Sequence, residues 1–112
     1  MDYPLCEQTV TVYRQENGQI TRRVAEGCFY RWEDRCSQDS QGLRFDRKFL
    51  LIQPGEKAIY PGDRIYPGVG PEVTEGDWAA FTPLNVPGLG VVTYATAYRL
   101  HNQVTHYQAG NK

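Results

Sequence analysis

Hydrophobic and polar residues alternate with a period of two in the first part of this chain. Val10 and Val12 lie on one face of the segment 9–14, and the segment 20–24 follows after Asn17-Gly18. This alternation predicts β-strands with one buried face, and Asn-Gly supplies the positive φ angles of a tight turn. We therefore expect a β-hairpin whose second strand, with its two successive arginines, lies at a sheet edge.

The same period continues in the segment 28–34, where Cys28, Tyr30 and Trp32 share one side. We expect this aromatic side to face the core and the opposite side to face water. After a polar turn, the segment 43–52 begins with alternation and ends in four consecutive apolar residues. That ending predicts a strand that passes into a core covered on both sides.

Proline and glycine dominate the middle of the chain. Four Pro-Gly or Gly-Pro pairs between residues 54 and 71 predict turns around one short strand at 63–66. The segment 74–81 predicts a single helical turn with Thr74 as its N-cap. Two further strands are predicted at 91–100 and 104–107, followed by a short tail at 109–112.

Six or seven short strands with long turn-rich connections predict an all-β fold with at most one short helix. We expect a small antiparallel β-barrel or sandwich with long Pro/Gly-rich loops, in one domain that spans residues 1–112. The composition agrees, because 11 glycines and 7 prolines are too many for a helical bundle, and the 14 aromatic residues, 8 of them tyrosines, are typical of β-sheets.

Charge and cysteine usage narrow the function classes. Twelve basic and 13 acidic residues give a net charge of -1, which argues against a protein dedicated to nucleic-acid binding. No stretch approaches the roughly 20 apolar residues that cross a bilayer, and the start of the chain does not read as a secretory signal. Three cysteines without a CxxC pair indicate a reduced, intracellular protein.

The reactive residue types do not gather into a recognisable site. His101 and His106 lack the spacing of a metal-ligand pair and predict surface histidines. Cys28 predicts a small core residue, and Cys36 an exposed, inert thiol. An acidic cluster lacks the pattern of a calcium loop and predicts a solvated segment: Glu72, Glu75 and Asp77. We therefore expect no enzyme, no cofactor and no metal.

The order of the sequence motifs along the chain is similar to that of a known family. The strand 10–13, the aromatic strand 28–32 and the segment 50–54 are followed by Gly62-Asp63-Arg64-Ile65-Tyr66-Pro67-Gly68 and by His106-Tyr107-Gln108-Ala109-Gly110. In this order the chain resembles small proteins of phages and prophages of Gram-positive bacteria, encoded among the head and head-tail joining genes. These proteins are often labelled minor capsid or head-completion proteins, and the likeness spans nearly the whole chain.

The resemblance implies a β-barrel subunit of a ring between the portal and the tail, acting as a connector or stopper. Such a subunit works by association. Its implied partners are further copies of the chain, a portal or adaptor protein and a tail-joining protein, with nucleic acid at most passing through the ring. The implied location is the cytoplasm of the bacterial host during assembly, and then the virion.

An uncharged loop at 78–87 is the first candidate for an interface, because interface centres favour aromatic residues and exclude charge. The equal alternative is a lid packed on its own barrel. The region 54–71 is the second candidate, and ordinary turns are its alternative. The candidate interface residues are Trp78, Phe81, Pro83, Leu84, Val86, Tyr60, Ile65 and Tyr66.

Two other function classes remain open at this point. An OB-like barrel that binds single-stranded nucleic acid would stack bases on Tyr30 and Trp32, helped by nearby arginines. A small enzyme would use Cys36 or the acidic segment. The near-neutral charge disfavours the first of these, and the lack of any catalytic grouping disfavours the second.

Overall fold

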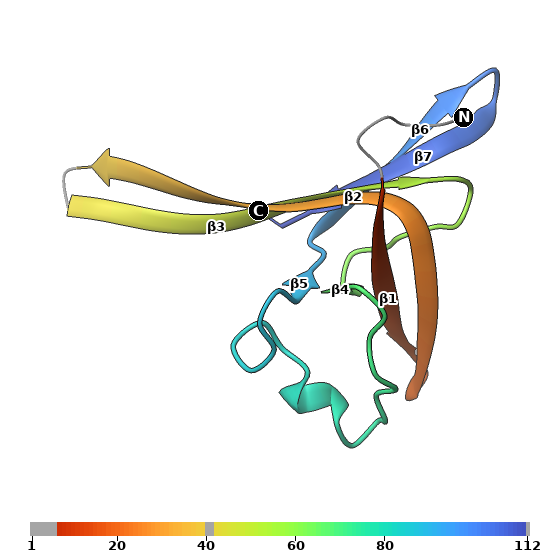
Figure 1. The fold of residues 1–112 in the computed structure, drawn as a ribbon, viewed down its shortest axis with the longest axis horizontal. Helices are drawn as coiled ribbons and strands as arrows, with labels where there is room; N and C mark the ends of the chain where they lie inside the picture. The colour runs from red at the N-terminus through yellow and green to blue at the C-terminus, as the bar shows by residue number, and fades with distance from the viewer. Residues whose placement is uncertain (1–6, 40–41, 112) are drawn as a thin grey trace.

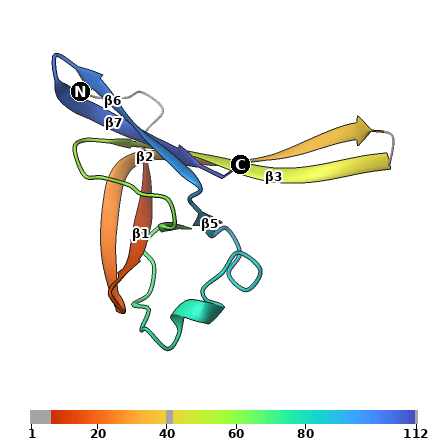
Figure 2. The same ribbon diagram turned by 180° about the vertical axis from the view of Figure 1, so that it is seen from behind.

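The computed structural model describes the backbone of residues 7–39 and 42–111, and the side chains of these residues outside 34–46. Seven strands form one curled antiparallel sheet in the order β5-β4-β1-β2-β3-β7-β6 (Figures 1 and 2), which confirms the predicted all-β antiparallel class. The strands are β1 (Gln8–Glu16), β2 (Gln19–Asp39), β3 (Gly42–Pro54), β4 (Arg64–Pro67), β5 (Gly90–Val91), β6 (Tyr94–Leu100) and β7 (Gln103–Gly110), with a 3-10 turn η1 (Trp78–Ala80).

The predicted first hairpin is confirmed. β1 and β2 pair from Glu16↔Gln19 onwards around a two-residue turn. Asn17 and Gly18 have φ angles of 51° and 79°, which are the left-handed values that this turn type requires.

β2 is one continuous strand where the sequence predicts two. It pairs with β1 over residues 19–28 and with β3 over residues 29–39, so its first half forms a local sheet edge, as predicted. The switch occurs next to an irregularity in the β1 register and at Gly27, whose φ is 69°. A bulge of this kind bends a strand sharply, and here it lets one strand serve both halves of the curled sheet.

The second half of β3 is covered less than its apolar run predicts. Phe49 and Leu51 are buried, whereas Leu50 and Ile52 on the opposite face are only half-buried. The prediction of a core on both sides is therefore wrong here. The outer face of β3 retains partly exposed apolar side chains.

β2 and β3 continue beyond the rest of the sheet as a two-stranded arm. β7 pairs with β3 only over residues 50–54, whereas β2 and β3 remain paired from Glu33↔Lys48 to Asp39↔Gly42. The arm, residues 33–39 and 42–48, projects away from the body of the molecule (Figure 1).

The predicted strand 91–100 is broken at residues 92–93. Val92 donates its amide to Asp63 O beside β4, whereas Thr93 donates its amide to Gly110 O in β7. The chain thus crosses from one edge of the curled sheet to the other, which draws the two edges together. The predicted tail is also wrong in part, because Ala109 is completely buried in β7.

The inside of the curl holds the main core, and the predicted core face of β2 is confirmed, with Cys28 and Tyr30 buried and Trp32 packed against them. The other buried members are Val10, Val12, Ala25, Phe49, Leu51, Ile59, Ile65, Val92 and Ala109.

A second core lies on the outer face of β1 and β4. Tyr13, Phe81 and Leu89 are its buried members, with Ile20, Tyr66, Val73, Trp78 and Val86 packed against them. The turn-rich segment 68–89 supplies most of these side chains, so it covers the outer face of the sheet. The predicted helical turn is confirmed as η1, but its N-cap is Asp77 and not Thr74, whose hydroxyl accepts the Asp77 amide in the preceding turn.

No helix in the described part of the chain is long and apolar enough to cross a membrane.

Candidate interaction surface

The structure places the eight predicted interface residues at very different depths. Leu84 is 94% exposed and Tyr60 52% exposed, whereas Phe81 is 7% exposed and Ile65 is completely buried. Pro83 is exposed, and three residues are half-buried: Tyr66, Trp78 and Val86. The loop 78–87 is therefore both a lid on its own sheet, through Phe81, and a projecting surface, through Leu84.

Phe81 anchors this loop. Its ring meets the ring of Tyr13 edge-on at a centroid distance of 4.7 Å and stacks with Tyr66 and Trp78, each at 6.4 Å. Aromatic pairs at these separations add to the stabilisation from burial alone. Phe81 thus fixes the loop to the sheet, while Leu84, three residues further on, remains exposed.

Arg64 fastens the same loop from β4. Its Nη1 donates hydrogen bonds to the carbonyl oxygens of Trp78 and Phe81. Its guanidinium also lies 3.7 Å from the centre of the Trp78 ring, in cation–π geometry. Partial burial lowers the pKa of Arg64, which stays fully charged at neutral pH.

A second Arg–aromatic pair faces the first across a cleft. The Arg14 guanidinium lies 4.4 Å from the centre of the Tyr60 ring. Arg14, Tyr60, Arg64 and Trp78 all line the same cleft of about 420 Å³. Tryptophan, tyrosine and arginine are the residue types most enriched at the energetic centres of protein interfaces. We call this set the Arg–aromatic cleft.

An ion pair between half-buried Arg14 and buried Asp63 forms part of the lining of this cleft. Asp63 is 1% exposed and accepts two hydrogen bonds from Arg14, of 3.0 and 2.9 Å, and one from the Tyr60 amide of 3.0 Å. The hydrogen bond from Arg14 to Asp63 is the main cause that raises the pKa of Arg14. This pairing holds Tyr60 and Arg14 in place relative to each other.

Arg23 extends the polar network away from the cleft. Its guanidinium donates to Gln53 Oε1 at 2.6 Å, and the Gln53 amide group in turn donates to Lys57 O at 2.7 Å. Burial, and then the charge of Arg14, lower the pKa of Arg23. The network ties the segment 55–63 to the end of the curled sheet.

The predicted interface residues did not include Arg14, Arg23, Arg64 or Asp63. A signal was present for Asp63, which lies in the most characteristic motif of the resemblance and directly after Pro61-Gly62. The arginines carried no such signal, because their hydrogen-bond partners are 14 to 49 positions away in the chain and meet them only after folding.

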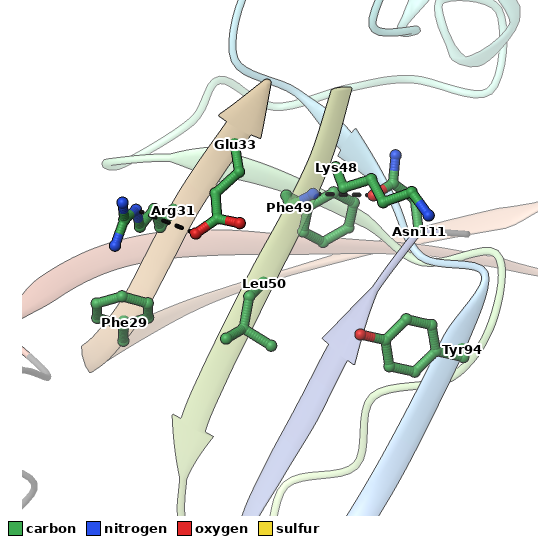
Figure 3. Close-up of a pocket in the computed structure, with 8 residues that line it drawn as sticks. All are labelled: Phe29, Arg31, Glu33, Lys48, Phe49, Leu50, Tyr94 and Asn111. Carbon is green, nitrogen blue, oxygen red and sulfur yellow. Dashed lines mark hydrogen bonds and ion pairs between the residues drawn. The ribbon is translucent and has the colours of Figure 1, made fainter. Parts of the chain in front are cut away.

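A smaller hollow lies on the outer face of the sheet where the arm begins (Figure 3). It measures about 270 Å³. Phe29, Leu50 and Tyr94 supply apolar walls, and an ion pair of 3.7 Å between Arg31 and Glu33 lies at the rim. The half-buried outer face of β3 is therefore the floor of a mixed apolar and charged depression.

The residues considered for chemistry are spread over the fold. Among the described residues no three His, Cys, Asp or Glu side chains gather in a metal-binding group. His101 is exposed in the last turn, and His106 stacks on Tyr98 at 4.7 Å. Cys28 is buried, whereas the side chain of Cys36 lies outside the described residues. The acidic cluster is exposed, as predicted: Glu72, Glu75 and Asp77.

The two aromatic residues of the base-stacking hypothesis lie in the core region. Tyr30 is 7% exposed and donates its hydroxyl to Gly88 O at 2.7 Å. The Trp32 indole donates to the Tyr30 hydroxyl at 2.9 Å. The Tyr30 ring is thus used for packing inside the curl and offers no face to a base.

No protein family, curated protein or solved structure compared with this chain matches it.

Proposed function

We propose that this chain is a structural subunit of a phage or prophage virion, of the head-tail joining type. In this role copies of the chain assemble as a ring between portal and tail and act by association. The resemblance in motif order is the reason for proposing a virion protein. The arm formed by β2 and β3 is the structural feature that best supports a role in association.

The arm supports association because of its energetics. An isolated two-stranded hairpin is marginal in water, and a third strand or a packing surface is needed to stabilise it. Over residues 42–48, β3 extends past the end of its pairing with β7, so β2 is its strand partner there. A neighbouring subunit would supply the missing surface.

The surfaces on the body suit the same role. The Arg–aromatic cleft and the exposed Leu84 lie on the side of β1 and β4, and the hollow at Phe29 and Leu50 lies at the base of the arm. Different patches on one subunit give heterologous contacts, which close into a ring when the rotation between copies is right.

Shortening the arm tests the proposal. Asp34 and Arg47 are paired, so replacing residues 35–46 by Asn-Gly restores a tight hairpin and keeps every described member of the two cores. We expect the shortened chain to unfold at a similar denaturant concentration but to lose concentration-dependent self-association and binding to the portal or adaptor protein of the same genome. Analytical ultracentrifugation and co-sedimentation measure both.

Leu84→Ser tests the loop contact, with Leu100→Ser as the matched control. Both leucines are exposed, at 94% and 52%. Leu100 is the last residue of β6 and pairs with Gln103 of β7, in a hairpin that lies far from η1 (Figure 1). We expect only Leu84→Ser to weaken association. A strict monomer at high concentration that also fails to bind a portal or adaptor protein would contradict the proposed function.

A further inference from the structure

A second pocket lies on the other side of Arg14 and Tyr60 from the Arg–aromatic cleft. It opens at the end of the curl, where β1 and β2 meet the segment 55–63, and measures about 330 Å³. Arg14 lies opposite Thr21 in the β1–β2 pairing, and Arg23 lies opposite Val12. The two arginines therefore come from adjacent strands onto the same face of the sheet. The lining is Val12, Arg14, Thr21, Arg23, Lys57, Ala58 and Tyr60.

The pocket holds more positive than negative charge. Three of its lining residues are cations, and the carboxylate bonded to one of them, Asp63, is buried and already accepts two hydrogen bonds from Arg14. Arg23 donates to the neutral oxygens of Gln53 and Ala58. Within the described residues, neither Arg23 nor Lys57 takes part in an ion pair. The side chains thus leave about two positive charges without a carboxylate partner.

This excess is local. The whole chain has a net charge of -1, so a general positive potential does not explain the pocket. Bringing Arg14 and Arg23 together costs free energy, since each charge disfavours the other, and partial burial adds to that cost. A bound anion would remove both costs.

We propose that this pocket binds a phosphate group. A phosphate dianion matches the uncompensated charge of Arg23 and Lys57, and its tetrahedral oxygens can accept hydrogen bonds from donors on several sides. A carboxylate carries one charge and two oxygens in a plane, so it satisfies fewer of the converging donors. The phosphate is either free or the terminal group of a phosphate monoester, which also carries close to two negative charges, and binding does not depend on ring assembly.

An NMR titration of the full chain with inorganic phosphate tests the proposal, at constant ionic strength and slightly above neutral pH. We expect saturable shifts of the amides of residues 12–14, 21–23 and 57–60. Lys57→Gln removes one charge from an exposed side chain and should weaken binding about fivefold. Arg23→Gln should weaken it further, and Arg99→Gln, an exposed charge on β6, should leave it unchanged.

Three results would overturn the proposal: shifts that rise without saturating, equal affinity for acetate at the same ionic strength, or unchanged phosphate binding in Lys57→Gln. The exposure of Lys57 keeps the test valid even if Arg23→Gln fails to fold. Thymidine 5′-monophosphate distinguishes the two sources. If it shifts the same amides and competes with phosphate, the ligand is a phosphate monoester, and if it does not, the ligand is free phosphate.

Discussion

Gly70 illustrates how closely the second core is packed at the scale of single residues. The Thr11 hydroxyl accepts the Gly70 amide at 2.8 Å, and Arg22 donates two hydrogen bonds to Gly70 O. A Cβ at this position would overlap the Tyr13 hydroxyl and lie 3.1 Å from both Tyr13 Cζ and Tyr66 Cδ1. Glycine is needed here because of space.

We expect Gly70→Ala to destabilise the protein by about 1–3 kcal/mol, the usual cost of overpacking a filled site. Gly76→Ala is the matched control, because its added Cβ would meet only Thr74 Oγ1, at 3.9 Å. Urea unfolding followed by tryptophan fluorescence measures both variants. Equal urea midpoints of unfolding for the two variants would show that the residues around Gly70 can shift to accommodate a Cβ at little cost in stability.

At the scale of elements, long turn-rich segments are held to the sheet by side chains of β1, β2 and β3. Arg14 donates to Ala58 O at 3.0 Å as well as to Asp63, and Gln53 reaches Lys57 O. On the opposite face, Thr11 donates to Gly68 O at 2.8 Å. These bonds satisfy backbone carbonyls that lie outside the ladders of the sheet, so irregular segments are placed as definitely as strands.

Asp63→Asn should therefore destabilise the segment 55–63 more than it destabilises the rest of the fold. The amide keeps an acceptor for the Tyr60 amide but leaves the Arg14 guanidinium without its carboxylate, at a cost of about 3 kcal/mol. We expect Asp63→Asn to increase the rate of amide hydrogen exchange more in the segment 55–63 than in β3. Asp77→Asn, at an exposed position, serves as control. Equal exchange rates in both variants would show that the ion pair is not what holds the segment.

At the scale of the whole molecule, two cores lie on opposite faces of β1 and each contains a buried tyrosine. Burial raises the pKa of Tyr30 in the main core and of Tyr13 in the second core. The folded state therefore holds these two phenolic protons more tightly than the unfolded chain does. This stability is fully present below the unfolded pKa of about 10 and is lost as the pH rises through the folded values.

We accordingly expect alkaline unfolding that is coupled to two late tyrosine ionisations. Phenolate absorbance follows these ionisations, and circular dichroism follows the fold. Tyr13 and Tyr30 should ionise together with the loss of the fold. Complete ionisation of all tyrosines in a folded protein would contradict this account of the two cores.

The candidate surface could be predicted from sequence only in part. The uncharged loop 78–87 was visible because aromatic and apolar residues without charge stand out in a polar chain. The Arg–aromatic cleft was not visible, because Arg14 and Tyr60 meet only when β1 and the segment 55–63 are brought together. Ile65 and Leu84 look alike in sequence, yet one is buried and the other almost fully exposed.

Local patterns were enough to determine the all-β class, the Asn17-Gly18 turn and the core face of β2, because each depends on neighbours a few positions apart. The curl of the sheet, the continuous path of β2 and the crossing at residues 92–93 were decided by tertiary structure. These features depend on which strand edges meet, and partners such as Arg64 and Val91, or Leu50 and Gly110, are 27 and 60 positions apart. No pattern within one segment encodes that choice, since it is made by the fit of the whole folded chain.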